Sequence, residues 1–280
     1  MKRLKDLGFT LVCLHYERVA FAQPYIDHWI YANLKDWAQC QAKVKEFFNT
    51  HSKIRPHGVI TFWEDYVVLT GVLAEALGLI GIPSSIAERI KNKYEFRTWC
   101  RQEGLPAPRS WRLARQDIIE LKDTLPYPVV VKPVYGASSA FVIKVENPEE
   151  LLRQVKVIEQ IVDNYGLVSG FKNFDLFLEE YIQGEEVDID ILIQDGTMKY
   201  AAITDNNKTN EPYFVETGER APSSLASQAQ QDFLVMAERT LSRLGVGNGC
   251  FHFEAKMSPQ GPVPIEINLR MGGGGVYLYN

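Results

Sequence analysis

Residues 265–275 of this chain read IEINLRMGGGG, an alternating apolar and polar run that ends in four glycines. Side chains alternate between the two faces of an extended strand, so Glu266 and Asn268 point to the same side. Glu254 lies in an earlier apolar run that also has the character of a strand. Carboxylates and amide carbonyls are the hard oxygen ligands that Mg²⁺ prefers. The three residues therefore predict a magnesium site.

The arginine and the glycines of this run indicate a second kind of contact. Consecutive glycines destabilise any helix or strand, and they let the backbone approach a ligand closely. Because Arg270 precedes them, we interpret residues 272–275 as the floor of an anion site, and a flexible linker is the alternative. For the carboxylates, the alternative to a metal is cross-strand pairing with Lys256 and Arg270.

A lysine ends an apolar run farther upstream. Residues 129–133 read VVVKP, and residues 135–139 read YGASS. Short side chains would let backbone N–H groups and two hydroxyls approach phosphate oxygens, while Lys132 supplies a point charge. A strand-edge lysine beside an ordinary hairpin turn is the alternative.

Residues 178–186, LEEYIQGEE, form an acidic and extended segment. Such a segment can offer an adenine one backbone carbonyl and one N–H, and a carboxylate farther along can bind both ribose hydroxyls. A solvated acidic strand end explains the same residues. Acidic and apolar residues alternate from 186 to 193, which predicts a half-exposed strand. Asp195-Gly196 then predicts a hairpin turn.

The composition is that of an ordinary globular protein, with 46% hydrophobic and 23% charged residues. The 30 basic and 35 acidic residues give a formal net charge of −5 without a long block of either sign, which disfavours a nucleic-acid partner. The four cysteines form no C-x-x-C pair, which disfavours a zinc site and indicates a reducing, cytoplasmic setting. The apolar stretch at 66–83 is interrupted by Glu75 and three glycines, so no membrane span is expected.

The chain alternates between strand-like and helix-like segments. Apolar runs at 9–14 and 58–62, with helix-compatible sequence between them, predict a βαβ unit with a parallel sheet. A helix is predicted over 63–77, and this unit is expected to end near residue 88. A helix over 92–103 ends at Gly104, and the prolines beyond it predict a linker. Farther along, strands are predicted at 129–132, 141–145, 176–181, 186–193, 198–203, 250–256 and 263–269, and helices at 148–166 and 227–244.

In their order, spacing and chemistry these segments resemble the nucleotide and metal motifs of the ATP-grasp superfamily. Within it, the chain is similar to the carboxylate–amine ligase branch, which includes carnosine synthase and bacterial L-amino-acid ligases. Three segments carry this resemblance: NKYEFR at 92–97, YFVETG at 213–218, and EINLRMGGG at 266–274.

The resemblance implies a fold of mixed α/β and α+β class. A Rossmann-like pre-ATP-grasp domain is expected at 1–88, followed by a two-lobed ATP-grasp domain at 89–280. The lid would cover about 111–183 and the metal-binding lobe about 184–280. The family's first strand and its last C-terminal elements are expected to lie outside these residues, so the isolated chain should be marginally stable. A homo-oligomer or a partner chain supplying the missing elements is expected.

The resemblance also implies a role for each matching residue. Lys93 and Lys132 would hold the α- and β-phosphates of ATP. The remaining ATP contacts would be Gly136, Ser138, Ser139, Glu179, Glu180, Ile182 and Glu186, with the backbone of Glu180 and Ile182 on the adenine and Glu186 on the ribose. Glu254, Glu266 and Asn268 would bind Mg²⁺, or Mn²⁺ in its place. Arg270 would stabilise the transferring phosphoryl group, and the substrate contacts would be Glu216, Arg220 and Gly273.

The chain departs from the family pattern in two places. The phosphate loop of the family often ends Ser-x-Gly-Val, whereas residues 139–142 here read SAFV, which disfavours close backbone approach at Phe141. Several relatives have histidine after the Glu-Thr-Gly motif, whereas this chain has Glu219 and Arg220. The second departure is expected to alter substrate choice.

The activity implied by the resemblance is ATP-dependent ligation of a carboxylate to an amine through an acyl phosphate, with release of ADP and phosphate. Amino acids or small carboxylates would be the substrates, and residues 200–225 would form a substrate-facing loop that orders on binding. The alternatives are a D-alanine ligase-like or biotin-carboxylase-like activity, or a non-catalytic nucleotide-binding module. Retention of the three metal-ligand candidates and Arg270 disfavours the last. No general base is identified: His252 is a candidate, but a strand histidine between phenylalanines is more often structural.

Overall fold

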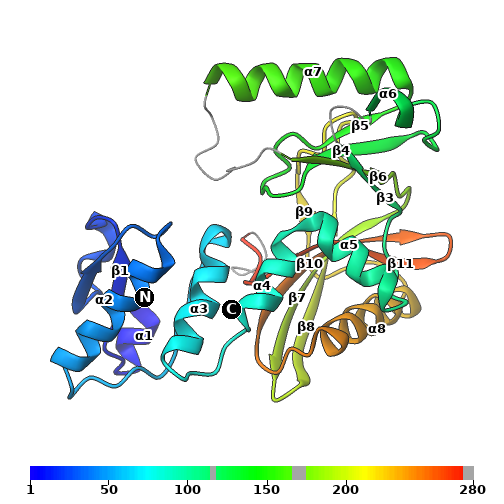
Figure 1. Ribbon diagram of the computed structural model, residues 1–280. Coiled ribbons are helices and arrows are strands. Elements are labelled where there is room, and N and C mark those ends of the chain that lie inside the picture. The colour runs from blue at the N-terminus through cyan, green and yellow to red at the C-terminus, as the bar shows by residue number, and fades with distance from the viewer. Residues whose placement is uncertain (114–117, 166–174, 274–280) are drawn as a thin grey trace. The chain divides into compact units, whose positions relative to one another are not determined.

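The structure is a computed structural model that describes residues 1–113, 118–165 and 175–273 (Figure 1). Its contacts divide the chain into two compact units, Met1–Ala87 and Glu88–Asn280. Each unit has its own hydrophobic core, and the cavity described below lies within the second unit.

The first unit contains a two-stranded parallel sheet. β1 (Val12–His15) pairs with β2 (His28–Tyr31). The helices of this part of the chain are α1 (Lys2–Asp6), η1 (Ala20–Ala22), α2 (Trp37–Thr50), η2 (Glu64–Tyr66), α3 (Val67–Ala76) and α4 (Ser84–Lys91). The core is formed by Ile30 of β2, Cys40 and Val44 of α2, and Leu69 and Leu73 of α3. Burying side chains of this size contributes about 1.5–3 kcal/mol each.

The predicted strand at 58–62 is wrong. These residues belong to no strand, and β1 instead pairs with β2, which the sequence patterns did not reveal. The Thr61 hydroxyl accepts from the Trp63 N–H at 3.1 Å and turns the chain into η2. Local side-chain bonds of this kind compete with strand pairing. Ile60 and Phe62 of this run are 65% and 70% exposed, whereas Val59 packs against the core of the first unit.

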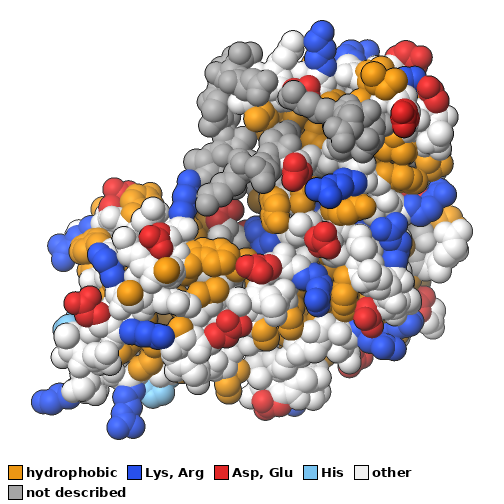
Figure 2. Space-filling view, viewed as in Figure 1, with side chains coloured by type: hydrophobic (Ala, Val, Ile, Leu, Met, Phe, Trp, Pro, Cys, Tyr) orange, Lys and Arg blue, Asp and Glu red, His pale blue; other side chains and the backbone are white. Residues whose placement is uncertain are grey.

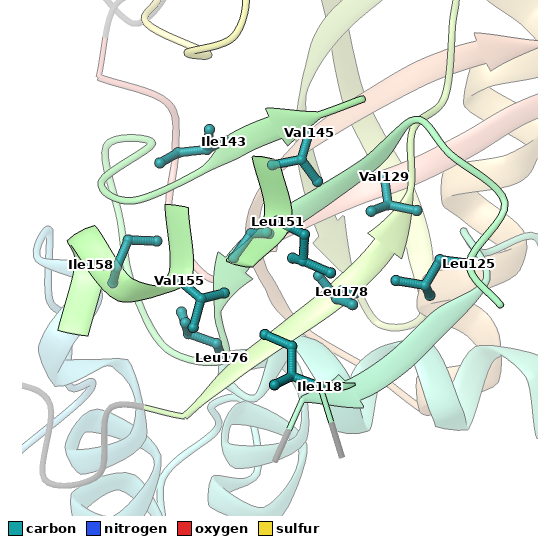
Figure 3. Packing of buried hydrophobic residues seen from close by; sticks show 11 residues of the cluster. Ile118, Leu125, Val129, Ile143, Val145, Leu151, Val155, Ile158, Leu176 and Leu178 are labelled. Carbon is teal, nitrogen blue, oxygen red and sulfur yellow. The ribbon is translucent and has the colours of Figure 1, made fainter. Parts of the chain in front are cut away.

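The second unit begins with α5 (Lys93–Gln102) and an antiparallel sheet, the lid sheet, in the order β3-β6-β4-β5. Its strands are β3 (Ser110–Leu113), β4 (Val129–Pro133), β5 (Ile143–Val145) and β6 (Leu176–Glu180). α6 (Ile118–Leu121) lies near one end of the lid sheet, and α7 (Pro148–Tyr165) covers one face of this sheet (Figure 1). Figure 3 shows Leu151, Val155 and Ile158 of α7 facing the valines and leucines of the strands. This packing holds β4 and β6, which carry site residues, in a fixed register.

The rest of the second unit, the C-terminal lobe, has an antiparallel sheet in the order β11-β10-β7-β8-β9. The strands are β7 (Glu186–Gln194), β8 (Thr197–Asn206), β9 (Glu219–Arg220), β10 (Gly249–Ser258) and β11 (Gly261–Asn268). α8 (Ser227–Leu244) packs along β11 and β8 and ends at Gly245, whose φ of 73° gives the left-handed cap expected of glycine. The helix end predicted at this glycine is confirmed.

The prediction of a hairpin turn before β8 is confirmed, whereas the prediction that β7 is half-exposed is wrong. Asp195 and Gly196 have φ values of 50° and 71°, which confirms the predicted hairpin turn. The half-exposed character predicted for β7 is wrong, because Asp188 and Asp190 are only 7% and 3% exposed. His252 lies 3.0 Å from Asp190 as a charge partner. Buried carboxylates require such partners.

Two general features of the described residues are the hydropathy of the helices and the distribution of surface charge. Within the described ranges, no helix is long and apolar enough to cross a membrane. Figure 2 shows basic and acidic side chains interspersed over the face that it draws.

We expect Gly184→Ala to destabilise the second unit. Gly184 lies between β6 and β7, and a Cβ on it would stand 1.8 Å from the Met257 backbone oxygen. The backbone must therefore move, at a cost of about 1–3 kcal/mol in the free energy of unfolding. Urea denaturation measures this loss. Gly247→Ala, where a Cβ would meet nothing within 4 Å, is the matched control and should change stability by less than about 0.5 kcal/mol.

Candidate functional site

One cavity of the second unit is lined by residues of the lid sheet and of the C-terminal lobe, with about 1020 Å³ of empty space including its mouth. Most of the residues that the sequence analysis selected lie on its wall. Those on the wall are Lys93, Lys132, Gly136, Ser138, Ser139, Glu179, Glu180, Ile182, Glu186, Glu216, Glu254, Glu266, Asn268 and Arg270. Segments more than 170 residues apart in sequence thus meet at one place.

Lys93 reaches the cavity from the first turn of α5. Asn92 caps this helix by accepting from the Glu95 N–H at 3.0 Å, a cap typical of asparagine. The Lys93 ammonium lies 3.1 Å from a Glu266 oxygen and donates to the Gly136 carbonyl at 2.9 Å. One lysine thereby joins the helix, the lid loop at 136–141 and β11 of the lobe.

Glu179 lies between two buried cations. Its carboxylate pairs with the Lys132 ammonium and accepts from Arg97 Nε at 3.1 Å. Arg97 is fully buried and also donates to the Ile265 carbonyl on β11, while its Nη1 has no hydrogen-bond partner among the described residues. Burial lowers the pKa of Lys132, and the charge of Glu179 opposes that effect. The network joins α5, both central lid strands and the lobe.

Glu254 and Glu266 face each other across β10 and β11. Burial and the charge of Glu266 raise the pKa of Glu254 to about 8. Burial would also raise the pKa of Glu266, but Lys93 and Lys132 outweigh it and lower that pKa. Asn268 Nδ2 lies 3.4 Å from Glu254 Oε1, so the three predicted metal ligands are neighbours.

The alternative to a metal was pairing of these carboxylates with Lys256 and Arg270. In the structure Glu266 pairs with Lys93, and Lys256 pairs with Glu186 at 3.2 Å. Among the residues described, no group of three or more Asp, Glu, His or Cys side chains is arranged to hold a metal ion. The predicted set of two carboxylates and one amide carbonyl still fits Mg²⁺, which commonly takes one or two protein carboxylates together with phosphate oxygens.

The loop at 136–141 has an unusual backbone. Ser138, Ser139 and Phe141 have φ values of 56°, 53° and 61°, in the left-handed region that favours glycine. Each such residue costs roughly 1–2 kcal/mol. Phe141, which stands where relatives often have glycine, packs against the hydrophobic core of the lid. That contact offsets the strain.

The strand edge predicted to meet an adenine has most of its N–H groups engaged. Glu180 N–H donates to the Arg109 carbonyl at 2.8 Å, and Tyr181 N–H donates to the Pro128 carbonyl at 3.4 Å. In the described part of the chain, no protein acceptor is found for the Ile182 N–H. The Glu180 side chain pairs with Arg109 at 3.2 Å. The backbone pattern therefore leaves a donor at Ile182.

The three residues predicted to contact substrate do not all lie on the cavity wall. Glu216 lines the cavity, whereas Arg220 and Gly273 are exposed and are not on its wall. Of the glycine run, residues 274 and 275 lie outside the described residues. Gly272 is buried, and its N–H donates to Asp190 at 2.7 Å. This part of the run binds a carboxylate of the protein itself.

His252 does not fit the role of a general base. Burial would lower its pKa, but the hydrogen bond that the ring donates to Asp190 and the charge of Asp188 raise it to about 9. The imidazole is therefore protonated at neutral pH. A Cβ on Gly272 would come within 2.6 Å of His252 Nδ1, so the ring supports the turn after Arg270. The structural role considered for this histidine is the one that the geometry favours.

Sequence reasoning gave no role to Arg97 or to Tyr181. Arg97 lies four residues after Lys93, on the same helix face, so helical spacing could have indicated that both side chains reach one site. Tyr181 lies between two predicted adenine contacts, and its ring stands 4.3 Å from the Lys144 ammonium. No sequence signal marks that contact, because Lys144 is on β5 and Tyr181 follows β6.

A family model described as an ATP-grasp domain matches residues 125–277, more than half of the 280 residues. The chain belongs to the ATP-grasp family. This confirms the superfamily and the mixed α/β ATP-grasp fold that the motifs at 129–139 and 265–275 indicated.

Relatives place the chain near amino-acid ligases of the ATP-grasp family. Carnosine synthase 1 of Gallus gallus is 32% identical over 232 residues, which cover 79% of this chain and 25% of that protein. Carnosine synthase 1 of Homo sapiens is 29% identical over 285 aligned residues, covering 96% of this chain and 34% of that protein. The chain thus spans a quarter to a third of these relatives.

A crystal structure of an L-amino acid ligase from Bacillus licheniformis superposes with a TM-score of 0.80 at 25% identity. The match covers 99% of this chain and 65% of that one. The resemblance to carnosine synthase and to bacterial L-amino-acid ligases is therefore confirmed.

We expect Arg97→Met to destabilise the second unit by about 3–5 kcal/mol, because removing one member of a buried ion network leaves its partner poorly compensated. Chemical denaturation monitored by tryptophan fluorescence measures the loss. Arg101→Met is the matched control: this arginine is exposed on the same helix, and its loss should cost less than about 0.5 kcal/mol. Equal stability of the two variants would show that Arg97 does not support the network.

Proposed function

We propose that this protein is an ATP-dependent ligase that joins a carboxylate to an amine. The carboxylate attacks the γ-phosphate of ATP to form an acyl phosphate, and the amine then displaces phosphate. Membership of the ATP-grasp family and the relatives named above support this proposal. Amino acids or small carboxylates are the proposed substrates.

The observation that carries the proposal is that cationic groups and oxygen ligands meet on one cavity wall. Lys93 and Lys132 are 8% and 3% exposed, and both line the cavity beside the loop of short side chains at 136–139. Glu254, Glu266 and Asn268 line the same cavity. Lysine ammonium groups suit phosphate oxygens, and carboxylates with an amide carbonyl suit Mg²⁺. The wall therefore fits the phosphates of a nucleotide together with a divalent cation.

The carboxylate pair fits a divalent cation. Glu254, Glu266 and Asn268 would hold Mg²⁺, and a bound cation would favour the ionised form of Glu254 that burial opposes. When bound, the metal stabilises the charge that develops on the transferring phosphoryl group. Mn²⁺ has the same ligand preference and would occupy the same residues.

The nucleotide would lie along the lid strand and reach the lobe. Ile182 N–H would donate to the adenine, and the Glu180 carbonyl would accept from it. Glu186 would bind the ribose, although its pairing with Lys256 means that it must share its oxygens. Glu179 is proposed as a support for Lys132 and Arg97, since its oxygens are taken by those cations.

The second substrate is proposed to lie near Glu216 and Arg270, which line the cavity. A carboxylate and a guanidinium could bind an ammonium and a carboxylate group, respectively. Arg270 would also contact the transferring phosphoryl group, where fixed positive charge lowers the barrier. Arg220 and Gly273 remain predicted contacts outside the cavity wall.

For the domains, we propose a Rossmann-like pre-ATP-grasp domain at 1–88 and an ATP-grasp domain at 89–280, with the lid at about 111–183. The parallel pairing of β1 and β2 and the 99% coverage in the ligase superposition support the first assignment. The two antiparallel sheets around one cavity support the second.

One experiment separates the candidate functions. The protein is incubated with ATP, Mg²⁺ and pools of amino acids, and ADP, phosphate and product masses are measured. A ligase releases ADP and phosphate together with a condensed product. Bicarbonate-dependent ADP release would favour a carboxylase-like activity, and ATP binding without turnover would favour a nucleotide-binding module.

We expect Glu266→Gln to reduce ADP release by more than about 100-fold and to weaken ATP binding far less, because the metal acts mainly on charge that develops during phosphoryl transfer. Steady-state ADP release and calorimetric ATP titration measure the two effects. Glu238→Gln, on the exposed face of α8, should match the unaltered protein in both. Near-normal Mg²⁺-dependent turnover of Glu266→Gln would remove this residue from the metal site.

We expect Lys132→Ala to fold and to bind ATP about 10- to 100-fold more weakly, since a charge-assisted phosphate contact contributes about 1.5–3 kcal/mol. Calorimetry measures the affinity, and circular dichroism checks the fold. Lys156→Ala on the exposed face of α7 is the control. Unchanged ATP affinity in folded Lys132→Ala would show that β4 does not hold the phosphates.

A further inference from the structure

Residues 207–218, which we call the strap, connect β8 to β9 of the C-terminal lobe. The two ends of the strap are held together, because Asn207 N–H donates to the Gly218 carbonyl at 2.9 Å. Thr209, Phe214 and Glu216 of the strap line the cavity. The strap is therefore anchored on the lobe and forms part of the site.

The middle of the strap pairs with the lid. Lys144 N–H on β5 donates to the Pro212 carbonyl at 2.9 Å, and Ile143 forms an antiparallel bridge with Tyr213. β5 is at the edge of the lid sheet, and an edge strand presents unpaired backbone groups that another segment can bind. A segment of the lobe thus adds to the sheet of the lid.

Glu211 strengthens this link with both of its oxygens. One lies 2.7 Å from the Lys144 ammonium, and the other accepts from the Tyr181 hydroxyl at 2.5 Å. Hydrogen bonds from Lys144 and Tyr181 lower the pKa of Glu211, so it is ionised at neutral pH. Burial and Glu211 raise the pKa of Tyr181 to about 12, so the phenol keeps its proton and donates it to this bond.

Tyr181 is also held from the lobe. The Lys256 ammonium lies 5.6 Å from the centre of the Tyr181 ring and 5.4 Å from that of Phe214, a strap residue. Tyr181 itself stands between Glu180 and Ile182, whose backbone groups form the strand edge on the cavity wall. The position of this edge therefore depends on contacts with the strap.

We propose that Glu211 is a positioning residue that fastens the strap to the lid and so sets the strand edge at 180–182 against a bound nucleotide. The inference rests on the proposed function in taking the cavity as the nucleotide site. Lid and lobe are already joined by the chain at 181–185 and by the contacts of Lys93 and Arg97, and the strap adds an attachment at the β5 edge. Together these attachments fix the separation between Lys132 of the lid and Glu266 of the lobe, which must act on one nucleotide.

The test compares Glu211→Gln with Glu146→Gln. Both glutamates pair with Lys144, at 2.7 Å and 2.8 Å, but Glu146 belongs to the lid, and its ion pair with Lys144 stays within the lid. The two variants remove the same charge from the same lysine, and only one of them breaks the link between lid and lobe.

Hydrogen exchange is measured first in the ligand-free proteins and then with Mg·ADP. We expect faster exchange in Glu211→Gln at 143–145 and 207–218 together, and unchanged exchange in Glu146→Gln. The KM for ATP and the Kd for Mg·ADP should rise about 3- to 10-fold in Glu211→Gln with kcat changed less than twofold, which is less than the loss of a direct charged contact with the nucleotide, because Glu211 acts only through Tyr181. Both variants should keep the melting temperature of the unaltered protein.

Unchanged exchange in Glu211→Gln, or equal effects of the two variants, would overturn the proposal, since equal effects would come from the charge of Lys144 and not from the link. A lack of ADP release from the unaltered protein would count against the ligase activity alone. Exchange at 143–145 and the affinity for Mg·ADP would then still decide the role of Glu211.

Discussion

The buried carboxylate of Glu179, held between Arg97 and Lys132, is the interaction on which the second unit depends. Glu179 comes from β6 and Lys132 from β4, so the pair fixes the two central strands of the lid. Arg97 extends the network to α5 and to the Ile265 carbonyl of β11 in the lobe. A buried charge without a partner is strongly unfavourable. The lid, the helix and the lobe must therefore meet in this arrangement for all three charges to be satisfied.

The same network would prepare the cavity for the proposed nucleotide. Arg97 and Lys132 share one carboxylate, and Lys93 pairs with Glu266. These three cations are buried, and each is held by at least one ion pair, so they have fixed positions. Fixed charges of this kind act on developing charge without having to reorganise. Stability and chemistry thus draw on one set of side chains.

The lid and the lobe contribute different chemistry to the proposed reaction. The lid supplies Lys132, the strained loop at 136–141 and the strand edge at 180–182. The lobe supplies the carboxylates of β10 and β11, with Arg270 after them. The strap connects these halves away from the Arg97 network, through Glu211. The separation of the two sheets is then set at two places, and each place depends on an ion pair.

The sequence alone determined the elements whose local pattern is strong and the residues whose chemistry is distinctive. The helix ending at Gly245, the turn at Asp195-Gly196 and the candidates Lys93, Lys132, Glu254, Glu266 and Asn268 could all be read from spacing, turn chemistry and the resemblance to the ATP-grasp family. Only the tertiary structure decided which charged side chains pair with one another and which strands pair. Lys93 and not Lys256 neutralises Glu266, β2 and not residues 58–62 pairs with β1, and the acidic face of β7 is buried. The physical reason is that period and propensity act over a few residues, whereas charge pairing and burial depend on which distant segments the fold brings within a few ångströms.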